Sequence, residues 1–392
     1  MRESLVVRAR RPLEQLFSYP FRIFFLSTGV IGAVLIPAWL VVLWQVHPKV
    51  LAVPGLFWHQ HEMTVGFLNA AVAGFLLTAV CNWTGTAPVA GKRLLGLWLV
   101  WLAGRVALAA GGAAPGLAAV VDLAFLPLVM LIVGVRVWRS RQSRQLFLLG
   151  VLAGLWLLDL LFHSTGNPRY LNALVLLVAV LIMVIGGRIT PAFSRNWLHR
   201  MGLGSQRVKT WLPLDVVALA AATGVVIAEA LAWSGKPVMV VAGLAALASG
   251  VRLVLWQGWL VRSEPLLWVL HLGHLWVVAG FALRALAEQG LVASTVWVHA
   301  LGPGAMATMI LGVMTRVGLG HTGRELRLPP GVLSCYLLIS LAALVRVLAG
   351  MEWIGWHAGL WGSAIFWTLA FARFCIFYAP ILSQPRADGR PG

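Results

Sequence analysis

The chain is built from long runs of apolar residues that are separated by short polar stretches. A helix that crosses a membrane needs about 20 apolar residues, and the sequence divides into runs of about that length almost from end to end. The pattern therefore predicts an all-α, polytopic membrane bundle with about twelve transmembrane helices. The expected spans are 22–46, 59–81, 94–112, 117–136, 145–163, 171–187, 213–233, 237–258, 265–287, 291–315, 331–350 and 355–380.

The positions of lysine and arginine give an independent test of this division. Membrane proteins concentrate both residues in cytoplasmic loops, and 23 of the 30 Lys and Arg residues fall in alternate connections if the N-terminus is inside. Both termini are therefore expected to be cytoplasmic, with short tails at 1–21 and 381–392. Four cations are exceptions on the outer side, namely Lys49, Arg169, Lys236 and Arg284. Three more lie within spans, namely Arg105, Arg346 and Arg373.

Composition supports a single transmembrane domain over residues 1–392. Hydrophobic residues make up 60% of the chain and the mean hydropathy is +0.88, which no soluble domain of this size could bury. The net charge of +18 lies in loops, so it indicates topology rather than a nucleic-acid surface. The long 188–212 connection has room for a short interfacial helix, and the first apolar segment is expected to be retained.

Motifs of conventional hydrolases and kinases are missing from the sequence. There is no phosphate loop, dinucleotide fingerprint, Ser/His/Asp set or Cys-x-x-Cys, and the three cysteines share no short spacing. The candidate chemistry therefore lies in the polar residues inside the spans, because ionisable groups at membrane depth are costly and usually functional.

The second span begins with WHQHEMTVG, which places His59, His61 and Glu62 at its expected periplasmic end. At 3.6 residues per turn the two histidines point about 200° apart, so a regular helix cannot direct both at one metal ion. Glu62 is expected on the side of His59, where it could orient an imidazole. Interfacial histidines that bond only to water and loop carbonyls are the alternative.

Two later spans carry histidines in apolar surroundings. The ninth holds His271 and His274 three residues apart, on one helical face. The tenth holds His299 and, on the same face, Met306, with a Gly302-Pro303-Gly304 stretch that would let the backbone kink or a flat group approach. Imidazole suits haem iron and copper, and thioether suits copper(I). Packing alone is the alternative, especially for the methionine.

Polar residues also gather at the expected cytoplasmic ends of three spans. Arg188 and Arg195 follow the sixth span, Arg316 and His321 end the tenth, and CNWTG ends the second. These residues either cap and anchor the ends of the helices, or form one shared pocket in which arginine pairs with carboxylates such as haem propionates. Further acids lie within spans. Asp159 lies one turn from His163, and the two form a candidate proton or metal relay. Asp122 and Glu229 are expected to be lone acids that face the bundle.

Six stretches, in order, resemble the NnrS family of twelve-span bacterial membrane proteins associated with the response to nitric oxide. These are YPFRIFFL, WHQHEMTVGF, AGFLLTAVCNWTG, GGRITPAFSRNW, EPLLWVLHLGHLW and HALGPGAMATMILGVMTRVGLGHTGREL. The resemblance implies haem, of b-type, and copper as cofactors, nitric oxide as ligand, and the bacterial inner membrane as location. It implies metal-binding roles at five positions that match recurrent histidines of the family, which are His59, His61, His271, His299 and His321. His274, Met306 and Glu62 are weaker candidates.

The depths of these residues predict two sites, an outer one near His59, His61 and His299 and an inner one near His271 and His321. The leading hypothesis is a protein that binds or processes nitric oxide and protects the cell from nitrosative stress, with a membrane or periplasmic electron donor left open. One alternative is a redox enzyme like a nitric oxide reductase. Another is a transporter or a protein that delivers metal or haem.

Overall fold

The computed structural model describes residues 12–44, 51–142 and 145–390. Within these ranges the chain is helical, with no β-strand. Predictions for Arg2, Arg8, Arg10, Arg11, Lys49 and Arg144, and for the end of the first expected span, lie outside the described residues.

Twelve spans within the described residues are long and apolar enough to cross a membrane, as the sequence predicts, so the chain is a multi-pass membrane protein. Several spans are made of more than one helical element, because short π-helical segments interrupt the second and the tenth. The first six spans are α2 (Pro20–Leu43), α3 (Gly55–His61) with η2 (Glu62–Gly66) and α4 (Phe67–Thr84), α5 (Gly91–Ala110), α6 (Pro115–Leu123) with α7 (Phe125–Arg139), α8 (Leu146–Thr165) and α9 (Arg169–Arg200).

Six further spans make up the second half of the chain. Between and beside the spans lie three short helices: α1 (Pro12–Leu16), η4 (Ser205–Arg207) and η5 (Gly258–Val261). The remaining spans are α10 (Leu212–Ala230), α11 (Lys236–Leu255), α12 (Pro265–Ala287), α13 (Val296–His299) with η6 (Ala300–Ala307) and α14 (Thr308–His321), α15 (Leu333–Gly350) and α16 (Trp356–Ser383).

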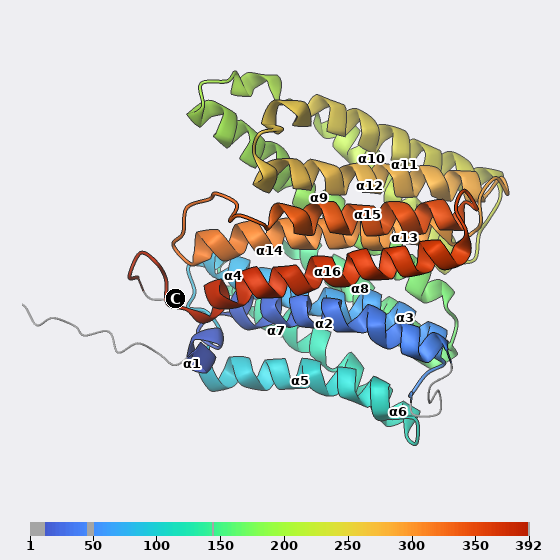
Figure 1. Cartoon of the computed structure of the whole chain (residues 1–392), viewed down its shortest axis with the longest axis horizontal. Helices are drawn as coiled ribbons and strands as arrows, with labels where there is room; N and C mark the ends of the chain where they lie inside the picture. The colour runs from blue at the N-terminus through green and yellow to red at the C-terminus, as the bar shows by residue number, and fades with distance from the viewer. Residues whose placement is uncertain (1–11, 45–50, 143–144, 391–392) are drawn as a thin grey trace, which may run out of the picture.

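The helices run roughly side by side, and α1 and the last described residues lie at the same end of the bundle, on the left in Figure 1. We call this the terminal end and the opposite one the far end. An even number of spans requires this arrangement. Which end faces the cytoplasm stays a prediction.

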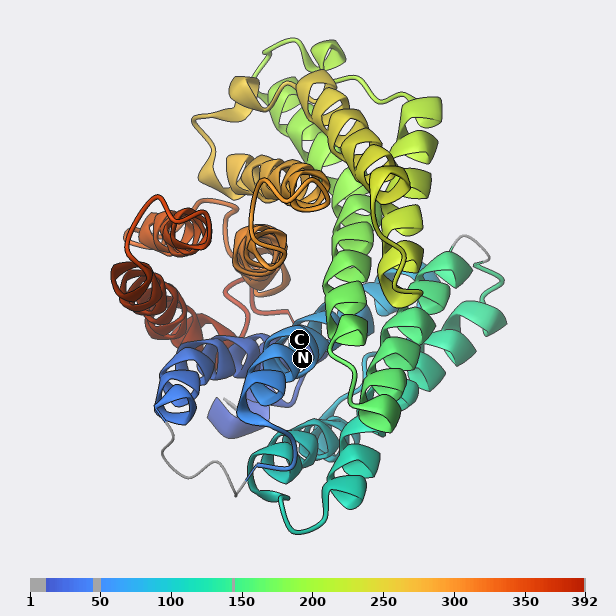
Figure 2. The same ribbon diagram turned by 90° about the vertical axis from the view of Figure 1, so that its right-hand side faces the viewer.

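Three spans form the centre of the bundle. The most apolar window of the second span is 89% buried, and those of the sixth and tenth are both 72% buried, against about a third for most outer spans. Figure 2 shows the helices end-on, with the first helices in blue beside the red C-terminal pair; α2 and α16 are in contact. The spans with the candidate histidines are therefore mostly interior ones.

The sixth span differs most from its sequence prediction. The expected span ends at 187, whereas α9 continues through Pro191 to Arg200, so the first half of the expected loop is helix. The extension is stabilised by a small apolar cluster, in which Trp197 and Leu198 pack with Val208 and Trp256. Arg and Pro in this stretch suggest a loop, but tertiary packing outweighs their local preference.

Candidate functional site

A cavity of about 430 Å³ lies toward the far end of the bundle; we call it the far chamber. His59 reaches it from α3, His299 from α13 and Met306 from η6, while Arg346 comes from α15. Most of the remaining wall is apolar or aromatic. Its volume is within the range of small-molecule and cofactor pockets, about 300–1,000 Å³.

The two imidazoles of the far chamber are free to bind a ligand. The Nδ1–H of His299 donates to the Thr295 carbonyl oxygen, 3.2 Å away, which leaves Nε2 with its lone pair. His59 stacks on Trp39 at 4.5 Å between ring centroids, and no group in the described part of the chain hydrogen-bonds to its ring. Gly302 lines the chamber, and a Cβ there would meet open space.

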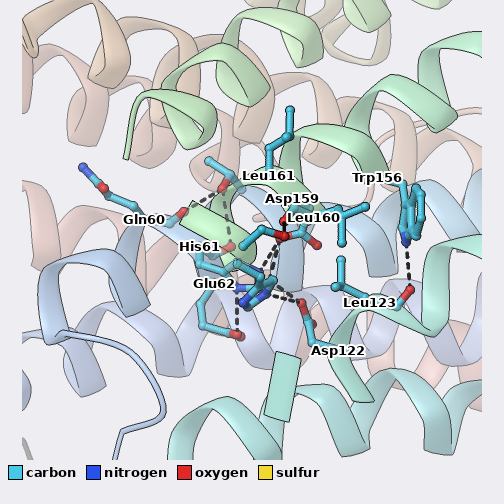
Figure 3. Close-up of polar contacts among 12 residues, drawn as sticks. Gln60, His61, Glu62, Asp122, Leu123, Trp156, Asp159, Leu160 and Leu161 are labelled. Atoms are coloured by element: carbon cyan, nitrogen blue, oxygen red, sulfur yellow. Dashed lines mark hydrogen bonds and ion pairs between the residues drawn. The ribbon is translucent and has the colours of Figure 1, made fainter. Parts of the chain in front are cut away.

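His61 points away from the far chamber. It does not line that cavity, and its ring enters a buried group of charged residues between α3, α6 and α8 (Figure 3). Helical spacing thus separates His59 from His61 as the sequence predicts. The expected pairing of His61 with His299 in one outer site does not occur.

Four side chains around His61 bring nitrogen and oxygen atoms to one point. His61 Nε2 lies 3.1 Å from an Asp122 oxygen and 3.0 Å from an Asp159 oxygen. His163 Nε2 lies 3.2 Å and 3.6 Å from the same two oxygens. We call His61, Asp122, Asp159 and His163 the ligand set. The predicted Asp159–His163 pair is therefore part of a larger group.

Two further charged residues complete this polar cluster, which comprises the ligand set, Glu62 and Arg105. Glu62 Oε1 lies 3.4 Å from His61 Nδ1, and the Arg105 guanidinium contacts both Glu62 and Asp122. Glu62 was expected on the side of His59, which is wrong: the π-helical segment begins at Glu62 and the carboxylate turns to its neighbour.

Two glycines make this packing possible. A Cβ at Gly66 would clash with the Arg105 guanidinium and the Glu62 carboxylate, and a Cβ at Gly104 would lie 3.1 Å from the Asp122 backbone. Trp101 Nε1 also donates to the Gly66 carbonyl oxygen at 2.9 Å. The small residues therefore allow α5 to approach both η2 and α6 closely.

A second cavity, of about 410 Å³, lies toward the terminal end; we call it the terminal chamber. His321 and Arg188 line it together with Asn82 and Trp83, so the ends of three spans do share one pocket, as the sequence suggested. The predicted Arg316 does not line this cavity and stacks instead over Phe193, a wall residue, at 4.3 Å.

The last turn of α14 is tied to the C-terminal segment. Arg386 donates to the His321 carbonyl oxygen at 2.9 Å and pairs with Asp388. The hydrogen bond from Arg386 lowers the pKa of the Asp388 carboxyl to about 2, so the pair would persist in moderately acidic solution. The predicted Arg195 lies apart from the chamber lining and donates to the Val208 carbonyl oxygen.

The predicted pair His271 and His274 reaches neither chamber. His271 Nε2 is 3.0 Å from the Ser194 hydroxyl, and His274 packs edge-on against Trp256 with ring centroids 4.8 Å apart. The expected inner site that would combine His271 with His321 therefore does not form. Both rings are buried between α9, α12 and Trp256.

An apolar cavity of about 90 Å³, which we call the apolar passage, lies between the two chambers. It shares Met306 with the far chamber and Phe75, Ile185 and Ile189 with the terminal chamber. The second, sixth and tenth spans supply most of its wall. The three central spans thus line a series of three neighbouring cavities between the ends of the bundle.

Comparison with known families agrees with the sequence motifs. The family model described as NnrS protein matches residues 15–386, nearly the whole chain. The chain belongs to the NnrS family. No curated protein matches it. NnrS membership makes this chain a membrane protein of the nitric oxide response in the general sense.

The sequence alone did not reveal the polar cluster of this NnrS protein. Asp122 and Glu229 were expected to be lone acids, which is wrong: Asp122 contacts Arg105, and Glu229 pairs with Arg284 at 3.0 Å. Arg105 was noted only as a cation within a span. One feature of the sequence could have indicated this pairing: charges of opposite sign lie at similar depth in different spans, and buried charges are usually paired.

Proposed function

We propose that this NnrS protein is a haem- and copper-containing protein of the bacterial inner membrane that binds nitric oxide within the bilayer and protects against nitrosative stress. The observation that carries the proposal is the far chamber, where His59 and His299 face one largely apolar cavity from different helices. A flat, mostly apolar cofactor with iron at its centre suits this donor set.

The residues of the far chamber fit haem better than a bare metal ion. Imidazole Nε2 of His299, and the ring of His59, would hold the haem through its iron atom. Arg346 lines the same cavity and stacks over Trp356 at 4.3 Å, so its guanidinium would pair with a propionate. The same positive charge opposes an isolated cation there, although the Met306 thioether would suit copper(I).

When bound, haem would supply the iron atom that binds nitric oxide, and copper would supply or accept an electron. The protein contributes position and access. Thr295 fixes the tautomer of His299, and Trp39 holds the His59 ring by stacking. The apolar lining of the passage would disfavour water and would suit a small neutral molecule that partitions into the bilayer.

Cofactor content tests this proposal. Full-length protein, expressed with abundant haem and copper and purified in detergent, is expected to show a Soret band with near-stoichiometric iron and to contain copper. His299→Ala and His59→Ala should each reduce the haem content or shift the Soret band. His199→Ala is the control, because His199 is exposed and lies outside both chambers. Haem-free wild-type protein, or unchanged spectra in both variants, would overturn the assignment.

The same preparation separates binding from turnover. Steady consumption of nitric oxide with an electron donor would identify a redox enzyme, whereas a single stoichiometric uptake would identify a binding protein. The presence of paired imidazoles in one chamber favours either of these over a transporter.

A further inference from the structure

We propose that His61, Asp122, Asp159 and His163 form a binding site for one divalent first-row transition-metal ion, separate from the haem chamber. The site goes beyond the haem assignment and stands without it. Its chemical class is a cation held by two imidazole nitrogens and two carboxylate oxygens, of the kind that zinc, iron or manganese takes, and it is distinct from the copper of the proposed function.

The first argument is the spacing of the four atoms. One ligand atom from each residue can be chosen so that all lie within 4.8 Å of one another. The four nitrogen-to-oxygen separations are 3.0, 3.1, 3.2 and 3.6 Å. A metal about 2.0–2.1 Å from each ligand in tetrahedral geometry requires separations of about 3.3–3.4 Å. The four nitrogen-to-oxygen separations therefore lie on both sides of the value that a tetrahedral site requires.

The second argument is charge. The cluster holds three carboxylates, those of Glu62, Asp122 and Asp159, and one guanidinium, that of Arg105. With both imidazoles neutral, two negative charges are therefore left without partners in a buried site. Uncompensated buried charge is costly. One divalent cation balances the cluster, and two imidazolium protons are the alternative.

The third argument is the position of Glu62. His61 has a carboxylate on each side: Glu62 beside Nδ1, and the two aspartates beside Nε2. A neutral imidazole has only one N–H, so one of its nitrogens would direct a lone pair at a carboxylate. Metal on Nε2 with a proton on Nδ1 removes this conflict. The resulting carboxylate–histidine–metal arrangement is the usual outer support of a metal-bound histidine.

The location also gives the ion a route of entry. His163 lies in the last turn of α8, beside exposed Ser164 and Thr165 at the far end of the bundle. His61, by contrast, is fully buried. An ion can therefore enter past His163 and be held against His61, which lies behind it.

Metal content of variants tests the site. The wild-type protein, stripped with a chelator and reloaded with Zn²⁺, Mn²⁺ or Fe²⁺ singly, should retain one of these ions at close to one per chain. His163→Ala and Asp159→Asn should lose most of it, while the haem content stays unchanged. Glu229→Gln is the control, because it removes one carboxylate of a different buried ion pair. Glu62→Gln should weaken metal affinity by about 10–100-fold.

Proton release provides a readout that needs no variant. Metal must displace the protons that otherwise balance the cluster, so adding the ion to stripped protein in weak buffer should release about one to two protons per ion. Retention of no transition metal by the wild type, equal retention by His163→Ala and Asp159→Asn, or preference for Mg²⁺ or Ca²⁺ would each overturn the proposal. Because haem is measured separately, a haem-free protein that binds the ion would refute only the proposed function.

Discussion

Arg105 is the residue whose removal the polar cluster should tolerate least. Its side chain is 9% exposed, and its guanidinium contacts Glu62 and Asp122, on η2 and α6. Arg105→Met keeps the length and apolar stem of the side chain but removes the only guanidinium of the cluster. Three carboxylates then face two imidazoles with no arginine between them.

The magnitude follows from the contact distances. The guanidinium nitrogen lies 3.3 Å from Glu62 Oε1, which corresponds to about 5 kcal/mol of attraction at an effective dielectric constant of about 20. Part of this attraction only offsets the cost of burying the guanidinium, which is several kcal/mol. Removing one partner of a buried pair typically costs about 3–5 kcal/mol, and we expect Arg105→Met to fall in that range.

A double-mutant cycle that combines Arg105→Met with Asp122→Asn isolates the interaction between Arg105 and Asp122. The double variant restores the charge balance of the wild type, so it should be less destabilised than the two single changes combined, with a coupling of about 0.5–3 kcal/mol. The assay is equilibrium unfolding in mixed micelles, with chelator present so that only protein charges contribute. A cost below about 1 kcal/mol for Arg105→Met, or additivity within about 0.5 kcal/mol, would refute this account of the cluster.

Three further predictions test the packing and the chambers. Gly66→Ala should destabilise the protein by about 1–3 kcal/mol in the same unfolding assay, because its Cβ meets Arg105 and Glu62, whereas Gly96→Ala, with open space, should be neutral or stabilising. Ala71→Leu should narrow the apolar passage and slow nitric oxide association in stopped-flow traces without changing the resting spectrum; an unchanged rate would exclude this route. Arg346→Gln should speed haem loss to apomyoglobin, and Arg188→Gln should not, since only Arg346 lines the far chamber.

Much of the architecture follows from local features of the sequence. The length of the apolar runs and the alternation of cations located the twelve spans of the described residues. Both features are set by the thickness and polarity of the bilayer, and not by which helices are neighbours. The separation of His59 from His61 followed from helical geometry alone. Both π-helical segments adjoin candidate histidines, and the glycine and proline residues of η6 had indicated an irregular backbone there.

The polar cluster could not be predicted in the same way. Its residues come from four spans, and periodicity gives the face of each helix but not its partner. Arg105 and Asp122 are 17 residues apart and meet only because Gly104 allows α5 to approach α6. For a similar reason His271 was grouped with His321 by depth, although their side chains point to different parts of the bundle.

The central claim is that nitric oxide binds at haem held in the far chamber. The most direct test is an anaerobic titration of the reduced, purified wild-type protein with nitric oxide, followed by optical and paramagnetic-resonance spectra. We predict a shift of the Soret band that saturates at about one nitric oxide per haem, with a nitrosyl signal that is altered in His299→Ala but not in His199→Ala. A Soret band that does not respond to nitric oxide would contradict the claim.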